Sequence, residues 1–287
     1  MSRTIGVLAA EHIAAGAVED NSLRGEIQLH VESLVDMPSS DIINNIAKLI
    51  EKVRGGSTIT AVGVGIPGII KNGTVEESPN LFQLKGREMS ASIADLLAKE
   101  GCNVPVTILN DADALAAGIA AKLGHLDRMI RVWWLGGGVG FGRYPRAEGV
   151  WEGGHMVVTL DSKEHFCQCG GAGHVEGIMG ERAMRLRFLD LEPEEVFEQA
   201  AEGDLRCSTF VKLWHRALAA ATATTVHLDG PGKIFISGPS SRFVQVGLLD
   251  MYLHEMVKMS PLQGTSFEIV STSDETAVIG AGLSALR

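Results

Sequence analysis

The sequence Trp151-Glu-Gly-Gly-His155, followed eleven residues later by Cys167-Gln-Cys-Gly-Gly-Ala-Gly-His-Val-Glu176, concentrates metal-binding side chains. Two thiols and two imidazoles fall within twenty residues, at His155, Cys167, Cys169 and His174. Such a set binds Zn²⁺ in closed, tetrahedral structural sites. The spacing therefore predicts a structural zinc site, and the glycines among the ligands allow the backbone to turn tightly around the ion.

A glycine-rich loop with two free thiols is the alternative interpretation of this stretch. Cys-x-Cys alone is a weak pattern, and only the flanking histidines strengthen it. Two carboxylates, Glu152 and Glu176, bracket the ligands. We predict that the metal fixes His155 and both glutamates so that they face a polyhydroxylated ligand.

The composition of the 287-residue chain is that of a soluble globular protein. Hydrophobic residues make up 45%, enough for the core of one large or two ordinary domains. A net charge of −10 argues against a nucleic-acid partner, because neutralising phosphates needs a basic face. The sequence has no apolar run long enough for a membrane span, and its start lacks the apolar core of a signal peptide. Four cysteines are not a disulfide framework at this size, so the expected location is cytoplasmic.

Strand and helix patterns alternate in both halves of the chain, which predicts an α/β fold. Short apolar runs predict strands at residues 4–10, 12–18, 27–31, 59–66, 104–109, 131–135, 233–236 and 267–270. Helical periodicity is found after residues 39–41 and over residues 90–100, 111–123, much of 177–224, 241–257 and 276–286. We place the joint between two domains at the helix that opens at Asp111. The smaller domain then comprises residues 1–112 plus 276–287, and the larger comprises residues 113–275.

Asn110 and Asp111 stand where a buried strand gives way to a helix. Ligands of α/β proteins bind at the carboxyl ends of strands, where a carboxylate can take a proton from a hydroxyl nucleophile. An aspartate is equally suited to cap the helix N-terminus, and the sequence leaves both roles open for Asp111. Asn80, in a Pro-Asn loop, could bond sugar hydroxyls or serve only the turn.

Two glycine-containing turns follow predicted strands. Consecutive glycines at Gly136, Gly137 and Gly138 would let backbone N–H groups approach an anion closely, as in a phosphate cradle. A tight hairpin explains the same residues. Gly238 lies in a Ser-Gly-Pro sequence that predicts only a turn, unless other residues place a nucleotide nearby.

Together these motifs resemble the ROK family of repressors, uncharacterised reading frames and sugar kinases, along essentially the whole chain. The family pattern is Gly-Glu-x-Gly-His, eleven residues, then Cys-x-Cys-Gly-x-x-Gly-Cys-x-Glu. His174 stands at the third cysteine. The chain keeps the pattern at Glu152, Gly154, His155, Cys167, Cys169, Gly170, Gly173 and Glu176. Further matches are Gly65-Ile-Pro-Gly68, Ser78-Pro-Asn80, Asn110-Asp111, the glycines of 136–140 and Ala277-Val-Ile-Gly-Ala281.

The resemblance implies a two-domain, actin-like ATPase fold of the hexokinase (ribonuclease H-like) type that binds a sugar and a nucleotide. It implies phosphoryl transfer from ATP with Mg²⁺ to a hydroxyl of a hexose or N-acetylhexosamine, with Asp111 as general base. The other hydroxyls would be held by Asn80, Asn110, Glu152, His155 and Glu176, and the nucleotide by Gly136, Gly137, Gly138 and Gly238. A homodimer is the family expectation. The family's repressors carry a helix-turn-helix ahead of this fold, whereas this sequence opens on the first strand, so DNA binding is not expected.

Both phosphate-contacting turns depart from the family pattern. Family kinases have Asp-x-Gly-Gly-Thr after the first strand; here Leu8 stands at the Asp, Ala10 and Glu11 at the glycines, and His12 at the Thr. The second turn usually reads Gly-Thr-Gly, and Gly137 stands at its Thr. Three hypotheses follow: an ATP-dependent sugar kinase, a sugar-binding pseudokinase that acts as a sensor or partner subunit, and an enzyme using another donor such as polyphosphate.

Overall fold

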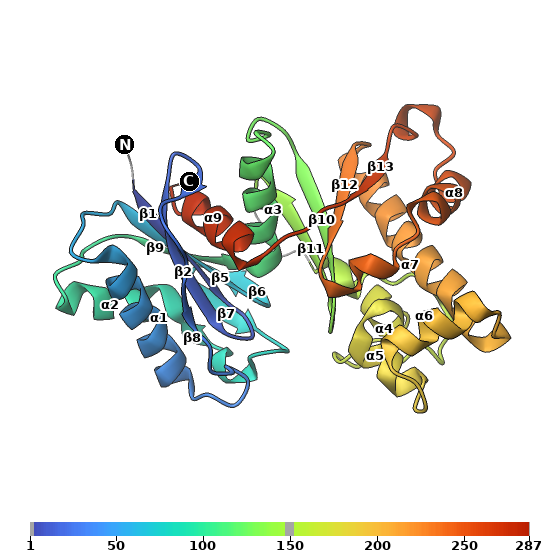
Figure 1. Cartoon of the computed structure of the whole chain (residues 1–287), viewed down its shortest axis with the longest axis horizontal. Coiled ribbons are helices and arrows are strands. Elements are labelled where there is room, and N and C mark those ends of the chain that lie inside the picture. Colours follow the sequence, from blue (N-terminus) through green and yellow to red (C-terminus); the bar gives the residue numbers. More distant parts are fainter. Residues whose placement is uncertain (1–2, 147–151, 287) are drawn as a thin grey trace. The chain divides into compact units, whose positions relative to one another are not determined.

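The computed structural model describes residues 3–146 and 152–286, which form two compact units (Figure 1). Unit 1 contains residues 3–132, 142–146 and 272–286 of the described chain, and unit 2 contains residues 133–141 and 152–271. Each unit has its own sheet, helices and hydrophobic core. Trp151, where the metal-binding stretch opens, lies outside the described residues.

The main sheet of unit 1 has the strand order β3–β2–β1–β5–β9, and β4 pairs with β2. Strand β1 runs antiparallel to β2 and parallel to β5, which is parallel to β9. A separate small sheet has the order β6–β7–β8. The strands are β1 (Thr4–Ala9), β2 (Ile13–Glu19), β3 (Ser22–Leu23), β4 (Gln28–His30), β5 (Ala61–Ile66), β6 (Ile69–Lys71), β7 (Thr74–Glu77), β8 (Arg87–Glu88) and β9 (Val106–Asn110).

Side-chain alternation along β1 separates the two faces of this sheet. Ile5 and Val7 belong to a core with α1 (Ser39–Arg54) and α2 (Met89–Lys99), which bury apolar residues at helical spacing. Gly6 and Leu8 alternate with them and so point to the opposite face. On that face lie α3 (Asp111–Lys122) and α9 (Asp274–Ser284), drawn in green and red in Figure 1.

Glycines allow α9 to pack directly against its neighbours. A Cβ added to Gly6 of β1 would lie 1.8 Å from the carbonyl oxygen of Val278 in α9. A Cβ added to Gly280 of α9 would lie 1.8 Å from the carbonyl oxygen of Ala114 in α3. This packing places residues 113–132 in unit 1, whereas our predicted boundary assigned them to the second domain.

A four-stranded sheet of order β11–β10–β12–β13 lies mostly in unit 2, because residues 130–132 of β10 and 142–144 of β11 are assigned to unit 1. The long helix α7 of unit 2 buries Trp214 and Leu218, and Trp133 of β10 donates an Nε1–H hydrogen bond to Thr222 of α7 at 3.0 Å. The elements are β10 (Ile130–Leu135), β11 (Val139–Tyr144), β12 (Lys233–Ser237), β13 (Ser266–Ile269), α4 (Val175–Met179), α5 (Glu181–Arg187), α6 (Pro193–Glu202), α7 (Leu205–Asp229) and α8 (Val246–Met256).

The predicted α/β alternation is confirmed, but the predicted helix over residues 241–257 was wrong at its start. Pro239–Phe243 forms a 3₁₀ helix, and α8 begins only at Val246. Between them, the backbone N–H of Gln245 donates to Nε2 of buried His215 at 3.0 Å instead of to a helical carbonyl. Across the described residues, the helices are too short or too polar to cross a membrane.

Candidate functional site

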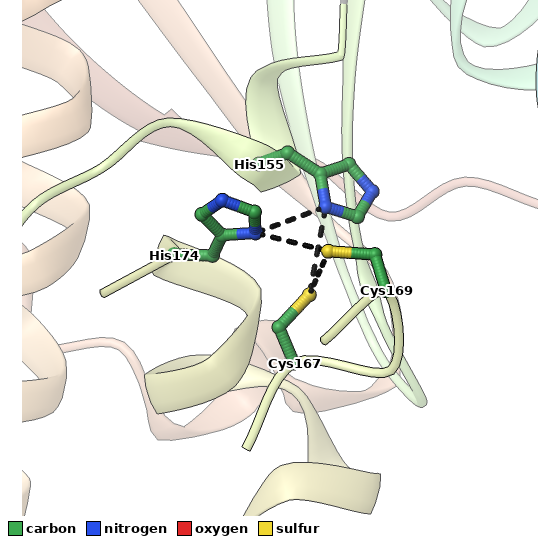
Figure 2. Close-up of side chains that lie close together, drawn as sticks. All are labelled: His155, Cys167, Cys169 and His174. Atoms are coloured by element: carbon green, nitrogen blue, oxygen red, sulfur yellow. Dashed lines mark hydrogen bonds between the residues drawn. The ribbon is translucent and has the colours of Figure 1, made fainter. Parts of the chain in front are cut away.

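The four metal ligands predicted from the sequence converge on one point in unit 2 (Figure 2). Their donor atoms all lie within 4.8 Å of one another. His155 Nδ1 lies 3.3 Å from His174 Nδ1 and 3.5 Å from Cys167 Sγ. Cys169 Sγ lies 3.3 Å from Cys167 Sγ and 3.2 Å from His174 Nδ1. Both imidazoles therefore present Nδ1 to the cluster.

These separations fit a tetrahedral zinc ion. With Zn–S bonds of about 2.3 Å and Zn–N bonds of about 2.0–2.1 Å, the ligand atoms of a tetrahedron lie about 3.3–3.8 Å apart. Burial raises the pKa of the Cys167 thiol, and a bound zinc ion would oppose this by favouring the thiolate. When Nδ1 of His155 binds a metal, its Nε2 remains at the opposite edge of the ring for a second partner.

Backbone contacts fold the metal loop, residues 155–174, around the cluster. Gly173 has a φ of +71°, and a Cβ there would lie 2.1 Å from the carbonyl oxygen of Thr159. The carbonyl of Gly173 accepts from Val158 N–H at 2.8 Å, and the N–H of Gly173 donates to the backbone carbonyl of Glu164 at 2.7 Å. This double pairing sets His174 opposite Val157 in a β-bridge. Only glycine fits at position 173, consistent with its place in the pattern.

An ion pair holds the metal loop to α5 independently of any metal. Arg187 Nη1 donates to Glu164 Oε1 at 3.0 Å, and Nη2 contacts Oε2 of the same carboxylate. The guanidinium also stacks 4.3 Å above the ring of Phe166. Bidentate geometry and stacking are interactions that arginine makes well. The loop is therefore anchored to α5 through Glu164 and Phe166.

Glu176 connects the metal loop to the glycine turn, residues 136–138. Its Oε1 lies 3.4 Å from Cys167 Sγ, and its Oε2 accepts from the backbone N–H of Val139 at 3.1 Å. A Cβ added to Gly138 would lie 2.6 Å from Oε2, so a side chain at this position would displace the carboxylate. Glu152, by contrast, precedes the short 3₁₀ helix Gly153–His155 and is half-buried.

The predicted nucleotide-binding glycines come together at one edge of the sheet of unit 2. A Cβ added to Gly136 would lie 3.2 Å from Cγ of Pro239, and one added to Gly238 would lie 2.3 Å from the carbonyl oxygen of Leu135. Gly238 also has a φ of +93°, so its backbone requires glycine. The ends of β10 and β12 are therefore in direct contact.

In unit 1, Asn110 rather than Asp111 caps helix α3. Asn110 Oδ1 accepts from Ala112 N–H at 2.8 Å, and its Nδ2 donates to the carbonyl of Gly68 at 2.9 Å. Asp111 occupies the first helical position, and its Oδ1 lies 3.0 Å from the same N–H. Burial raises the pKa of Asp111 to about 6, although that backbone hydrogen bond opposes the shift.

Asn80 belongs to a loop that meets the same Pro67-Gly68 turn. Buried Ser78 donates from Oγ to the carbonyl of Pro67 at 2.7 Å and accepts from Leu81 N–H at 3.3 Å. Asn80 lies between these contacts with an exposed side chain. The structure thus gathers the unit 1 part of the predicted sugar site, Asn80, Asn110 and Asp111, around the ends of β5 and β9.

The first turn, residues 10–12 between β1 and β2, does not resemble a phosphate loop. Leu8 is a regular strand residue, paired with Ala14 on one side and Gly65 on the other. Glu11 is exposed, and His12 Nε2 lies 2.8 Å from Asp274 Oδ2 at the start of α9. The side chain at the family's threonine position therefore contacts a carboxylate.

Sequence reasoning missed two residues beside the predicted site, Gln168 and Arg182. Arg182 Nη1 donates to Gln168 Oε1 at 2.6 Å, and the Arg182 backbone N–H donates to the carbonyl of Gly137 at 3.3 Å. Gln168 lies between the two cysteines, which was the one available signal. Arg182 lies in a helix that carries no motif, so only the tertiary structure reveals it.

Comparison with known proteins gives one consistent result. The ROK family model matches residues 5–286. The glucokinase of Pyrobaculum calidifontis is 28% identical, over 85% of this chain and 84% of that protein. The xylose repressor of Caldicellulosiruptor bescii is 24% identical, over 84% of this chain and 65% of that protein.

A crystal structure of a ROK family glucokinase from Streptomyces griseus, in complex with glucose and AMPPNP, matches the fold with a TM-score of 0.72. The match covers 99% of both chains at 20% identity. The predicted actin-like ATPase fold is thereby confirmed. With a family match along almost its whole length, the chain belongs to the ROK family.

Proposed function

We propose that the protein is a sugar kinase that transfers a phosphoryl group from ATP to a hydroxyl of a hexose or N-acetylhexosamine. The observation that carries this proposal is the state of Asp111. The capping role that would have explained this carboxylate structurally is filled by Asn110, and burial raises the pKa of Asp111 to about 6. General bases work best with a pKa near the operating pH.

In this mechanism, Asp111 accepts the proton of the attacking hydroxyl as the oxygen bonds to the γ-phosphorus and ADP departs. Phosphoryl transfer needs positioning and charge neutralisation more than covalent catalysis. Mg²⁺ bound with ATP would neutralise part of the negative charge of the phosphates. The glycine turn and Gly238 supply backbone at the ends of two strands where the nucleotide would lie.

The other predicted sugar ligands fall into two sets. Asn80 and Asn110 belong to unit 1, whereas Glu152, His155 and Glu176 belong to unit 2. The metal loop supports the second set: Nδ1 of His155 faces the cluster, and Glu176 lies against Cys167. We propose that a structural zinc ion holds the side chains of this second set in position, and that each set binds sugar hydroxyls.

A sugar-binding sensor without kinase activity is the second candidate. The observation that favours it is the first turn, where Leu8 replaces a carboxylate and His12 contacts Asp274. The likeness to a xylose repressor agrees with sugar recognition without phosphoryl transfer. In this alternative, Asp111 would hold a sugar hydroxyl and take no proton.

One experiment separates these candidates. Purified protein is given a panel of hexoses and N-acetylhexosamines with ATP and Mg²⁺, and in parallel with polyphosphate, while ADP release and sugar phosphate are measured. Asp111→Asn is compared with Asp113→Asn, two residues along the same helix, whose Oδ1 accepts the backbone N–H of Arg143 at 2.9 Å. Kinase function predicts sugar-dependent turnover that Asp111→Asn abolishes and Asp113→Asn retains.

Stabilisation by a sugar without turnover on either donor would instead support the sensor. Turnover with polyphosphate but not with ATP would show that the protein is a sugar kinase whose phosphoryl donor is polyphosphate. Equal turnover by Asp111→Asn and the wild-type protein would refute the assigned base.

A further inference from the structure

The glycine turn of unit 2 has an arginine beside it. A Cβ added to Gly137 would lie 3.6 Å from Nε and 3.8 Å from Nη2 of Arg182. The guanidinium group therefore lies in van der Waals contact with the position where family kinases carry a threonine. Residue 137 has lost its hydroxyl, but a cationic hydrogen-bond donor lies at the same place.

Arg182 is oriented from two directions. Its backbone N–H donates to the carbonyl of Gly137, and the preceding residue, Glu181, donates to the carbonyl of Gly136 at 2.9 Å. Its Nη1 donates to Oε1 of Gln168 at 2.6 Å. The side chain is exposed, so a ligand at the turn can reach it.

We propose that Arg182 binds the oligophosphate group of the phosphoryl donor, in place of the missing threonine. This inference rests on the kinase function proposed above. A guanidinium group pairs with two phosphate oxygens at once, which a threonine hydroxyl cannot do. Its charge opposes the negative charge that develops during phosphoryl transfer. The altered glycine turn thus keeps a phosphate contact that the sequence pattern alone does not show.

The metal loop takes part in this arrangement. Gln168 lies between Cys167 and Cys169, so a metal that fixes the two cysteines also limits where the amide can lie. Glu176 adds a second link, from Cys167 Sγ to the N–H of Val139 at the end of the glycine turn. Gln168 is therefore a positioning residue for Arg182, and the metal loop supports the donor site as well as the sugar site.

The test measures donor and sugar binding separately in Arg182→Gln, Arg182→Lys and Gln168→Ala. We expect Arg182→Gln to raise the KM for the donor and the Kd of Mg²⁺–ADP about 10- to 100-fold, because hydrogen bonds to a charged group are lost. The Kd for sugar should change less than about twofold, because Arg182 contacts Gln168 and the glycine turn, and effects at separate sites are close to additive. Arg182→Lys should retain part of the affinity through its charge, and Gln168→Ala should raise the donor KM about two- to fivefold with unchanged zinc content.

Arg185→Gln is the matched control. Arg185 lies on the same helix, is exposed, and pairs with Glu192 at 2.7 Å and with Glu181 at 3.8 Å. Its donor KM should equal that of the wild-type protein. ATP and polyphosphate are tested in separate arms, and the effect of Arg182→Gln should appear on whichever donor the wild-type protein uses.

Wild-type turnover with an unchanged donor KM in Arg182→Gln and Arg182→Lys would overturn this inference and leave the kinase proposal intact. Loss of sugar binding in Arg182→Gln but not in Arg182→Lys would also overturn it, because Arg182 would then support the fold. A wild-type protein that binds sugar but neither donor would overturn both proposals together.

Discussion

The metal loop and the first turn both lie where the resemblance predicts ligand-binding residues, but they are built differently. In the metal loop, four side chains converge within 4.8 Å, and an Arg187–Glu164 pair anchors them from the side. In the first turn, Leu8 pairs as an ordinary strand residue, and His12 reaches Asp274. Side chains of the metal loop form a connected network, whereas the first turn lacks the side chains that phosphate binding uses in family kinases.

This difference shows what each kind of site requires. A metal cluster fails when one ligand is lost, because the other three cannot complete the coordination. A phosphate turn relies largely on backbone N–H groups, so a neighbouring side chain can replace a lost contact. Arg182 beside Gly137 is such a neighbour. Substitutions in the metal loop should therefore cost more than substitutions in the first turn and the glycine turn.

The largest expected effect is at Asp111. Asp111→Asn should lower kcat by about 10²- to 10⁴-fold, the range for removing a general base. The wild-type kcat/KM should rise with pH through about 6 as Asp111 loses its proton. A pH–rate profile of the wild-type protein and of Asp113→Asn checks this. A flat profile between pH 5 and 8 would show that Asp111 is not the base.

The same substitution should stabilise the protein at neutral pH. The folded-state pKa of Asp111 is raised from 3.8 to about 6, so its contribution to stability is complete below about pH 4 and is lost as the pH rises through 6. Asp111→Asn should then increase the free energy of unfolding at pH 7.5 by about 1–3 kcal/mol. Urea unfolding of both proteins at pH 4 and pH 7.5 measures the difference, which should nearly vanish at the lower pH.

Breaking the metal cluster should give the next largest effect. Cys167→Ser or Cys169→Ser should lower the zinc content from one ion per chain and weaken sugar binding about 10- to 100-fold, through displacement of His155 and Glu176. Cys102→Ser, a buried cysteine of unit 1, should leave both quantities unchanged. Elemental analysis and calorimetric titration give the two values. A folded wild-type protein without bound zinc would disprove the metal's role.

Substitution of two of the predicted nucleotide-binding glycines should change stability by very different amounts. Gly238→Ala should cost about 2–4 kcal/mol of stability, because the backbone is left-handed and the new Cβ meets the Leu135 carbonyl. Gly137→Ala should change stability by less than about 1 kcal/mol, since its Cβ meets Arg182 only at ordinary contact distance. Denaturant unfolding compares the pair. Equal losses would mean that the glycine turn is as constrained as the Gly238 turn.

The smallest effect should come from the first turn. His12→Ala removes a partly exposed pair with Asp274 and should cost less than about 1 kcal/mol of stability. Sugar affinity should be unchanged. A loss of sugar binding, measured by titration, would contradict the view that this turn has no part in sugar recognition.

Local patterns in the sequence predicted most elements and all four converging ligands. Strand alternation and helical periodicity reflect local burial, and Cys/His spacing limits how ligands can meet. Two features were beyond such patterns. Asn110 takes the capping role because its amide can also donate to Gly68, a contact across 42 residues. Helix α3 belongs with unit 1 because of its contacts with α9, which no local pattern encodes.

The dependence of unit 1 on α9 has a consequence for biosynthesis. A ribosome releases residues 3–132 long before residues 274–284, so the glycine-lined faces of β1 and α3 wait for their partner while all of unit 2 emerges. Unit 2 contains its own core and can fold in the meantime. During that interval the nascent part of unit 1 leaves these faces uncovered, and we expect chaperones to bind it preferentially.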